Sequence, residues 1–503
     1  RELITAHIWS AGLQPLGYQP VRGELMQKVG NKPYISVNYT FDGLTPAGLP
    51  EDLCYKLNQY YEQKLRQDKT AHDKIEFEII FNTYDFMTDT RLKELAEYGF
   101  DDVEISQLRN ALFEIAKQTL EHYDEICEED LRSLGQLTEL RHELRKHSPL
   151  AETNVMKLYS YIDELLDSIK DHGTPQFTRQ ARCAFMARSF CRTLVEKGYF
   201  TKQEMDDFML SIPTVASEFE RDFDLYSHGK LSRDDFNHLY GHLRLGTYDI
   251  RSDSYRNIYF DVASANLTGN NKVKQEAKSL DLERLQVALD EAGIPVTPEK
   301  FIEFIKKATQ NREYFKFEFT KSLSLMLDVI VKLGEVMAIA REDMSYLEIQ
   351  DLLSYHSRDS YIQTIETRRR FYHVNSYLVL PEVIFDVGDI DVIDIDEARP
   401  NFITNKVVEA PIVNLDEDHD SDITGKIVVL TKADPGYDWI FAKDIAGFVT
   451  KYGGAASHMA IRCAEFGIPA AIGCGEKIYQ RIHRMQIMCL DCENGRITEK
   501  QSQ

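Results

Sequence analysis

Long apolar segments are absent from this sequence of 503 residues. No run approaches the roughly 18 apolar residues that a membrane-spanning helix requires, and no secretory signal peptide opens the chain. Positive charge is also in short supply, because 59 lysines and arginines stand against 82 aspartates and glutamates, a formal net charge of −23. Nucleic acids and anionic membrane surfaces are bound through cationic patches. The composition therefore predicts neither nucleic acid nor membrane as a partner.

Cysteine pairs and metal-ligand spacings are equally scarce. The eight cysteines are scattered through segments that read as helix and strand, which predicts reduced thiols in a cytoplasmic protein. Cys489 and Cys492 have CxxC spacing, but no second pair or histidine couple completes a zinc site. The acidic run Leu415–Asp422 fits no EF-hand loop. We predict no metal site in this chain.

A nucleotide-binding stretch is also missing. The sequence has no P-loop, and no Gly-rich strand–turn–helix outside the segment at 450–473. The chain begins at Arg1 within what looks like a helix, RELITAHIWSAGL, so we expect an upstream part to be missing.

The length allows two to four domains with sizeable cores. Residues 1–100 are mixed, with a strand predicted over Pro33–Phe41, and helical periodicity dominates from Asp101 to about Arg370. Short strands and helices alternate after Asn405. We therefore predict an α+β multidomain fold: a mainly helical body at 1–380, a connector at 381–405 and a compact α/β domain at 406–503.

The most informative segment leads into a single histidine. Five small residues, from Gly453 to Ser457, precede His458, and an amphipathic helix follows. Ser457 is the expected N-cap, which places His458 in the first turn, where the helix dipole disfavours imidazolium and should keep the ring neutral and nucleophilic. A histidine that merely packs at a helix end is the alternative, but small residues suit an approachable nucleophile better than packing.

Two segments of the helical body could line a small-molecule site. The first, His238–Ile250, gathers His242, Arg244, Tyr248 and Asp249 at a glycine-flexed turn, although a capped helix end with a surface turn would look the same.

The second segment, Asn311–Leu323, places Arg312, Lys316 and Thr320 on one helix face with Glu313 beside them. Ordinary ion pairing between residues four positions apart explains this pattern equally well.

The segment at 450–473, TKYGGAASHMAIRCAEFGIPAAIG, resembles the phosphohistidine swivelling domain of phosphoenolpyruvate-utilising enzymes, whose pattern is TxxGGxxSHxAIxAxExGIPAxxG. Cys463 replaces the usual alanine, which is a small-for-small change. The resemblance implies that His458 carries a phosphoryl group. It also implies that the surrounding loop is supported by Thr450, Gly453, Gly454 and Ser457.

The helical body resembles the central domain of phosphoenolpyruvate-synthase-like phosphotransferases, in YGHLRLGTYDIRSDSY and REYFKFEFTKSLSLMLD. Within them the chain is most similar to the L-glutamine kinases of bacterial capsule biosynthesis, and more distantly to rifampicin phosphotransferases. The latter have GHRGPGEYD where this chain has GHLRLGTYD, so Arg244 is shifted by one residue and Thr247 replaces a glutamate.

The resemblance implies an enzyme of three parts, an ATP-grasp domain, an acceptor domain and the swivelling domain. Mg²⁺ and ATP would be bound by the ATP-grasp part, in cis upstream or in trans, and the β-phosphate would pass through His458 to a small acceptor such as the amide of L-glutamine. The acceptor-binding candidates are His242, Arg244, Tyr248, Asp249, Arg312, Glu313 and Lys316. Two alternatives stay open: a non-catalytic phosphocarrier or regulatory module phosphorylated in trans, and a phosphoenolpyruvate synthase-like enzyme.

Overall fold

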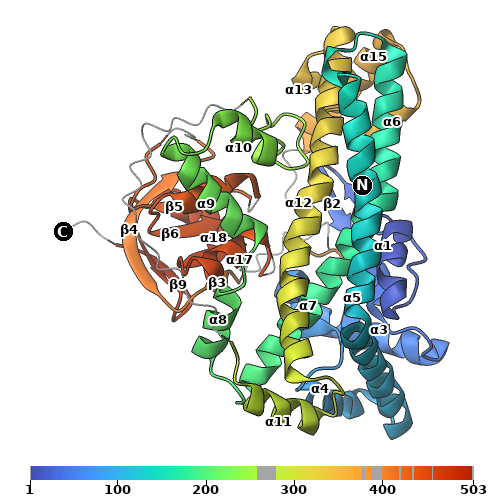
Figure 1. The fold of residues 1–503 in the computed structure, drawn as a ribbon, viewed down its shortest axis with the longest axis vertical. Coiled ribbons are helices and arrows are strands. Elements are labelled where there is room, and N and C mark those ends of the chain that lie inside the picture. Colours follow the sequence, from blue (N-terminus) through green and yellow to red (C-terminus); the bar gives the residue numbers. More distant parts are fainter. Residues whose placement is uncertain are drawn as a thin grey trace.

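The computed structural model describes residues 2–257, 279–375, 380–386, 389, 399–417, 421–432, 435–455 and 457–500. These residues form two lobes, a body of long helices and a smaller lobe built on a seven-stranded sheet (Figure 1). The predicted helical body and α/β unit are thus confirmed in outline. The predicted domain boundaries stay predictions, and residues 387, 388 and 390–398 of the connector at 381–405 lie outside the described residues.

The first hundred residues correct one sequence prediction. The turn at Gly30 joins an antiparallel hairpin of β1 (Met26–Val29) and β2 (Lys32–Ile35). The strand predicted over Pro33–Phe41 is wrong beyond Ile35, because the side chain of Ser36 caps a helix there. The helices of this region are α1 (Ala6–Leu13), α2 (Val37–Leu44), α3 (Glu51–Gln67) and α4 (Thr88–Arg91).

Four long helices make the body: α5 (Asp102–Lys146), α6 (Val155–His172), α7 (Thr174–Glu196) and α12 (Pro298–Val336). Local signals fix their starts. Asp101 and Glu104 form a capping box at α5, and Thr297 caps α12 with Pro298 in its first turn. Apolar side chains at helical spacing pack between these helices, and each fully buried leucine or phenylalanine stabilises the fold by about 1.5–3 kcal/mol.

Further helices extend from this bundle: α8 (Lys202–Leu210), α9 (Val215–Ser227), α10 (Arg233–Tyr240), α11 (Leu282–Ala292), α13 (Arg341–Met344), α14 (Ile349–Leu353) and α15 (Arg358–Asn375). Helices α8, α9 and α10, green in Figure 1, leave the bundle and lie beside the smaller lobe. An aromatic cluster that includes Phe219, Phe236 and Tyr240 holds α9 and α10 together.

The smaller lobe has the strand order β3-β7-β6-β5-β4-β8-β9. Its strands are β3 (Asn401–Ile403), β4 (Val407–Asn414), β5 (Ile427–Leu430), β6 (Gly447–Thr450), β7 (Ala470–Ile472), β8 (Ile487–Asp491) and β9 (Arg496–Glu499). Strands β4 to β7 are parallel, and β3, β8 and β9 add antiparallel pairs at the two sides. The 3₁₀ helix η7 (Pro435–Ala442) and helices α17 (His458–Glu465) and α18 (Gly475–Ile482) complete the lobe, with an apolar core on each face of the sheet.

A close backbone contact joins the two lobes. A Cβ at Gly436 of η7 would lie 1.8 Å from the carbonyl oxygen of Arg244 in the body, so only glycine fits there. The hydroxyl of Tyr255 donates to the carbonyl of Gly436 at 2.5 Å, and Trp439 packs on the aromatic cluster of α9 and α10. The smaller lobe is therefore docked on the body.

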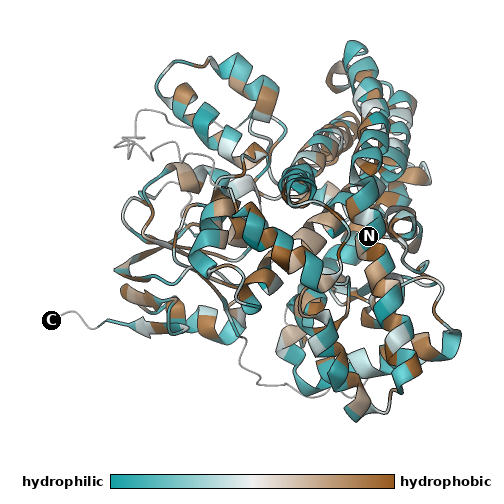
Figure 2. Cartoon of the chain, turned by 60° about the horizontal axis from the view of Figure 1, so that its bottom comes forward, coloured by the Kyte–Doolittle hydropathy of each residue, from teal (hydrophilic) through white to brown (hydrophobic). Residues whose placement is uncertain are grey.

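Figure 2 shows the two lobes side by side, with hydrophilic and hydrophobic segments alternating along the helices of the body. Among the described residues, no helix is both long and apolar enough to cross a bilayer. All eight cysteines are free, including Cys489 and Cys492, and Cys492 donates its thiol to the carbonyl of Ala470.

Candidate functional site

His458 opens helix α17, as the sequence predicts. The Oγ of Ser457 accepts a hydrogen bond from the backbone N–H of Ala460 at 3.3 Å, which confirms the predicted N-cap. The helix ends just before Gly467, which has φ +59° and lets the chain turn back into β7.

The residues of the preceding loop have structural roles. Thr450 is fully buried, and its hydroxyl accepts a hydrogen bond from the N–H of Gly473 at 3.2 Å. Gly453 has φ +134°, and its carbonyl oxygen would lie 2.3 Å from a Cβ at Gly473, so both positions require glycine. Gly454 faces the body, where a Cβ would be 3.3 Å from the carbonyl oxygen of Asp73. At these glycines the backbone of the loop passes close to other backbone atoms, both within the lobe and at the body.

The ring of His458 lies between carboxylates from both lobes. Its Nδ1 is 3.2 Å from Oε2 of Glu313 on α12, and its Nε2 is 2.7 and 2.9 Å from the two carboxylate oxygens of Asp438 on η7. Only 8% of the histidine side chain is exposed. The ring therefore points out of its own lobe and into the junction with the body.

These carboxylates decide the charge of the ring. Burial alone would lower the pKa of His458, but Asp438 and Glu313 outweigh it and raise the pKa above the usual 6.5. Burial likewise opposes ionisation of Glu313, yet His458, Arg312 and Lys316 hold its pKa well below the usual range. The prediction that this environment disfavours imidazolium is wrong for the docked arrangement, because two carboxylates at hydrogen-bond distance exceed the effect of the helix dipole.

A buried arginine stands behind Asp438. Arg462 is 1% exposed, and its Nε is 3.6 Å from Oδ1 of Asp438. It also pairs with Glu465 at 2.7 Å and donates to the carbonyl oxygen of Ala216 in the body at 3.1 Å. Arg462 thus ties the histidine helix both to η7 and to α9.

A small cavity of about 50 Å³ adjoins the ring, between α9, α12 and the turn after α10. The residues that line it include His458, Asp438, Glu313, Lys316, His242 and Thr320. An apolar cavity of about 150 Å³ admits a molecule of the size of benzene. The docked arrangement therefore holds only a few atoms beside His458, and a larger molecule has to enter while the lobes are apart.

His242 is a buried and unsatisfied member of this cavity. It is 5% exposed, and its Nε2 has no hydrogen-bond partner. Burial, followed by the charges of Lys321 and Arg141, lowers the pKa of His242 well below 6.5. The ring is therefore neutral and able to exchange a hydrogen bond or a proton with a ligand.

The other predicted residues of the body are placed differently. Arg244 lines the cavity, but its guanidinium is engaged by Ser324, the carbonyl of Ser252 and Asp328. Tyr248 is 58% exposed and Asp249 binds Arg251, so neither reaches the cavity.

Arg312 lies beside the cavity rather than in its lining. Its Nε is 3.8 Å from Oε1 of Glu313, and its guanidinium lies over the ring of Phe185 at 5.2 Å. The structure therefore places His242, Glu313 and Lys316 in the cavity beside His458. Arg312 lies outside the lining and contacts Glu313.

Sequence reasoning missed Asp438 and Arg462. Asp438 sits in the run YDWIF, where one acid among large apolar residues was a usable signal, because such a residue needs a buried partner. In the described part of the chain, no group of three or more His, Cys, Asp or Glu side chains is arranged to hold a metal ion.

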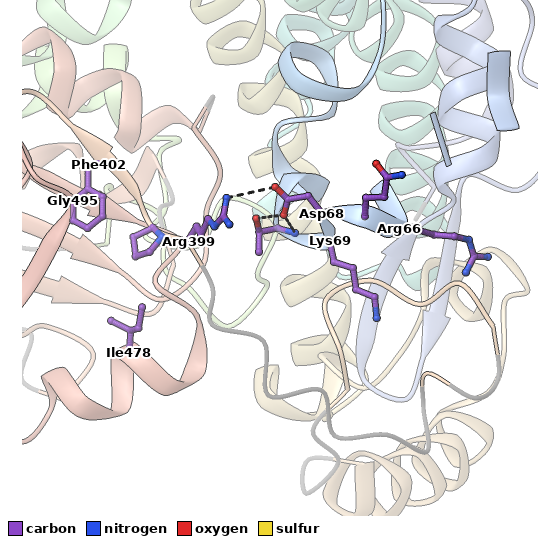
Figure 3. Close-up of a pocket in the computed structure, with 10 residues that line it drawn as sticks. Arg66, Asp68, Lys69, Arg399, Phe402, Ile478 and Gly495 are labelled. Carbon is purple, nitrogen blue, oxygen red and sulfur yellow. Dashed lines mark hydrogen bonds and ion pairs between the residues drawn. The ribbon is translucent and has the colours of Figure 1, made fainter. Parts of the chain in front are cut away.

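A second hollow, of about 780 Å³, lies where the connector reaches the sheet (Figure 3). Arg399 forms an ion pair with Asp68 across it at 3.6 Å, and Arg66, Lys69, Phe402 and Ile478 also line it. None of the predicted site residues contributes to this hollow.

Comparison with known proteins finds a family match within the smaller lobe. Residues 423–495 match the mobile domain of PEP-utilising enzymes. The matched residues include His458 and every residue from β5 to the turn before β9.

Two curated relatives extend the likeness. Over 222 residues the chain is 28% identical to rifampicin phosphotransferase of Bacillus subtilis (strain 168), covering 40% of this chain and 24% of that protein. Over 212 residues it is 26% identical to rifampicin phosphotransferase of Bacillus cereus, covering 38% and 24%. The chain spans about a quarter of the length of the curated relatives it matches. These matches support the PEP-utilising family.

Proposed function

We propose that this chain is the acceptor-and-carrier part of a phosphotransferase, in which His458 carries a phosphoryl group to a small acceptor held by the helical body. The observation that supports this best is the position of one ring. His458 belongs to the lobe that matches the mobile domain, yet it borders a cavity whose walls come mostly from the body. A covalent relay of this kind divides one transfer into two steps.

The residues of the cavity can supply what the transfer of the phosphoryl group requires. The P–N bond of phosphohistidine breaks and its electron pair returns to the ring, while a bond forms between phosphorus and an oxygen or nitrogen of the acceptor. The proton lost by the acceptor goes to a base, for which neutral His242 and ionised Glu313 are the candidates. Lys316 and Arg312 offset the negative charge of the moving group.

The amide of L-glutamine, in capsule polysaccharide biosynthesis, is our first candidate acceptor, ahead of another metabolite amide or hydroxyl and of an antibiotic. This order rests on the resemblance of the helical body, since the cavity of the docked arrangement holds only a few atoms of any acceptor. Mg²⁺ and ATP would act on an ATP-grasp part, in cis or in trans, which phosphorylates His458 from the β-phosphate and leaves AMP and phosphate.

Two experiments test the proposal. The chain treated with phosphoramidate, a small P–N phosphoryl donor, should gain one phosphoryl group on His458, visible by mass spectrometry under alkaline conditions. The full-length protein with ATP and a metabolite panel should release AMP beyond one equivalent per protein, followed by phosphorus NMR, only when an acceptor is present.

His458→Ala should abolish both signals and leave the fold intact, because the ring is the only proposed carrier. AMP-coupled phosphorylation of an acceptor that persists in this variant would falsify the relay. If the adduct forms on His458 but no small-molecule acceptor removes the phosphoryl group, the result would instead indicate the non-catalytic phosphocarrier or regulatory module.

A further inference from the structure

Four arginines of the body gather where helices α7 and α12 meet the smaller lobe: Arg182, Arg188, Arg192 and Arg312. Their guanidinium groups lie over the rings of Phe77 and Phe185, which contact each other edge to face with their centres 5.8 Å apart. The guanidinium groups of Arg188 and Arg192 lie 5.5 and 5.7 Å from the ring centre of Phe77. Those of Arg182 and Arg312 lie 5.4 and 5.2 Å from the ring centre of Phe185. The result is a dense group of positive charges in a chain of net charge −23.

Three of these arginines have carboxylate partners. Arg182 lies 3.6 Å from Glu76, Arg192 lies 3.2 Å from Glu196, and Arg312 lies 3.8 Å from Glu313.

Arg188 differs from the other three. Among the residues that the structure describes, no carboxylate lies within ion-pair distance of its guanidinium, and the side chain is exposed at the junction. Desolvation by the surrounding protein, followed by the charges of Arg312 and Arg192, lowers the pKa of Arg188. The charge of Arg188 is thus in surplus at this place.

The surplus charge faces the loop that carries His458. Nη1 of Arg188 is 3.5 Å from the carbonyl oxygen of Ala455, three residues before His458. Arg312 approaches from the other helix, beside the carboxylate of Glu313 that contacts the ring. A bond of 3.5 Å is at the long limit for a hydrogen bond, and among the described residues the other donors of the Arg188 guanidinium have no hydrogen-bond partner.

We propose that Arg188, together with Arg312, binds the phosphoryl group of phosphorylated His458 when the smaller lobe docks on the body. This inference rests on the proposed function. A phosphoryl group adds about 1.5 to 2 negative charges at neutral pH. It would be placed beside Glu313 and Asp438, which attract the protonated ring but repel the phosphorylated one. Arginine forks at the junction offset this repulsion.

The charge state of the ring therefore decides which contacts hold the lobes together. The bare ring is held by Glu313 and Asp438, whereas the phosphorylated ring needs the arginines. If Arg188 only fastened the loop through Ala455, its removal would weaken docking equally with and without the phosphoryl group. This difference separates a phosphoryl-binding role from a merely structural one.

The test compares small-angle scattering of the chain before and after treatment with phosphoramidate. Mass spectrometry reports the occupancy of His458 in each sample. The unsubstituted chain should stay docked in both states. Arg188→Gln should dock normally when bare and lose docking, by about tenfold or more in the ratio of docked to open molecules, when phosphorylated. Arg188→Lys should restore part of this docking. Arg192→Gln, one turn along α7 and paired with Glu196, is the matched control and should stay docked.

Each outcome bears on one claim. If the unsubstituted chain forms no adduct on His458, the proposed function and this inference both fail. If the adduct forms and Arg188→Gln scatters like the unsubstituted chain, the inference alone is overturned. It is also overturned if phosphorylation opens the unsubstituted chain, or if Arg188→Gln is already open when bare.

Discussion

At the scale of single residues, the protonation of His458 depends on groups that are distant in sequence. Asp438 lies 20 positions away and Glu313 lies 145 positions away, and together they keep the docked ring charged more readily than a free histidine. A proton on the ring therefore acts as a contact between the two lobes.

Replacing Glu313 with glutamine should lower the pKa of His458, because one of the two carboxylates that raise it loses its charge. NMR titration of ¹³C-labelled histidine C2 resonances measures this directly. Glu335→Gln is the control, since this carboxylate lies on the same helix but is 61% exposed and pairs with Lys332. A His458 titration unchanged in Glu313→Gln would show that the contact to α12 is not formed in solution.

The sequence predicted several residues of this site and missed others for a physical reason. His458 and Ser457 were found because turn chemistry and capping act over a few neighbouring positions. Lys316 was found on one helix face with Arg312 and Thr320, and Glu313 was found beside that face. Asp438 and the charge of the ring were missed, because both depend on side chains that meet only after the chain has folded.

At the scale of elements, local signals again separate what could be predicted from what could not. The caps of α5, α12 and α17 and the apolar strands β5 to β8 were predictable, since each depends on its own few residues. The strand over Pro33–Phe41 failed because Ser36 starts a helix within an alternating pattern. The contact of Gly436 with Arg244 has no local signature at all.

Replacing Gly436 with alanine should separate the lobes, because the new methyl group would lie 1.8 Å from a backbone oxygen. Small-angle scattering should show a larger radius of gyration with an unchanged circular dichroism spectrum. Gly135→Ala is the matched control, since a Cβ in the middle of α5 meets nothing within 4 Å and should stabilise that helix by about 0.5–1 kcal/mol. If the lobes stay docked in Gly436→Ala, the turn at Arg244 moves to admit the methyl group, and this close contact does not determine docking.

Replacing Arg179 with alanine should destabilise the body by about 3–5 kcal/mol, because it strands the buried carboxylate of Asp130. Arg179 pairs with Asp130 at 2.5 Å and also binds the carbonyl oxygens of Ala11 and Gly12, so it joins α1, α5 and α7. Urea unfolding measures the loss. Arg132→Ala, exposed on α5, should change the free energy of unfolding by less than about 0.5 kcal/mol. Equal stability of the two variants would contradict this account.

At the scale of the whole molecule, the arrangement of the lobes was beyond the reach of sequence patterns. Helical and α/β periodicities indicated a helical body and an α/β unit, but no pattern in either lobe specifies the other's surface. The docked arrangement follows from a few long-range fits, chiefly Gly436 on the turn after α10 and Arg462 on α9.

Docking should weaken as pH rises. The pKa of His458 is raised above 6.5 in the docked arrangement, so protonation stabilises docking fully below pH 6.5, and this contribution is lost as pH rises through the raised value. Scattering measured between pH 5.5 and 8.5 should show a growing open population. His458→Gln should remove this dependence, and a dependence that persists in that variant would assign it to other groups.

The placement of the thiols gives the molecule a ready means of observing such motion. Six of the eight cysteines are buried, while Cys54 on α3 of the body and Cys489 on β8 of the smaller lobe are partly exposed. Burial raises the pKa of the Cys54 thiol, so Cys54 should take up a maleimide dye more slowly than a free cysteine. Two dyes attached at different times would then report by energy transfer, molecule by molecule, how far the lobes separate in the natural sequence.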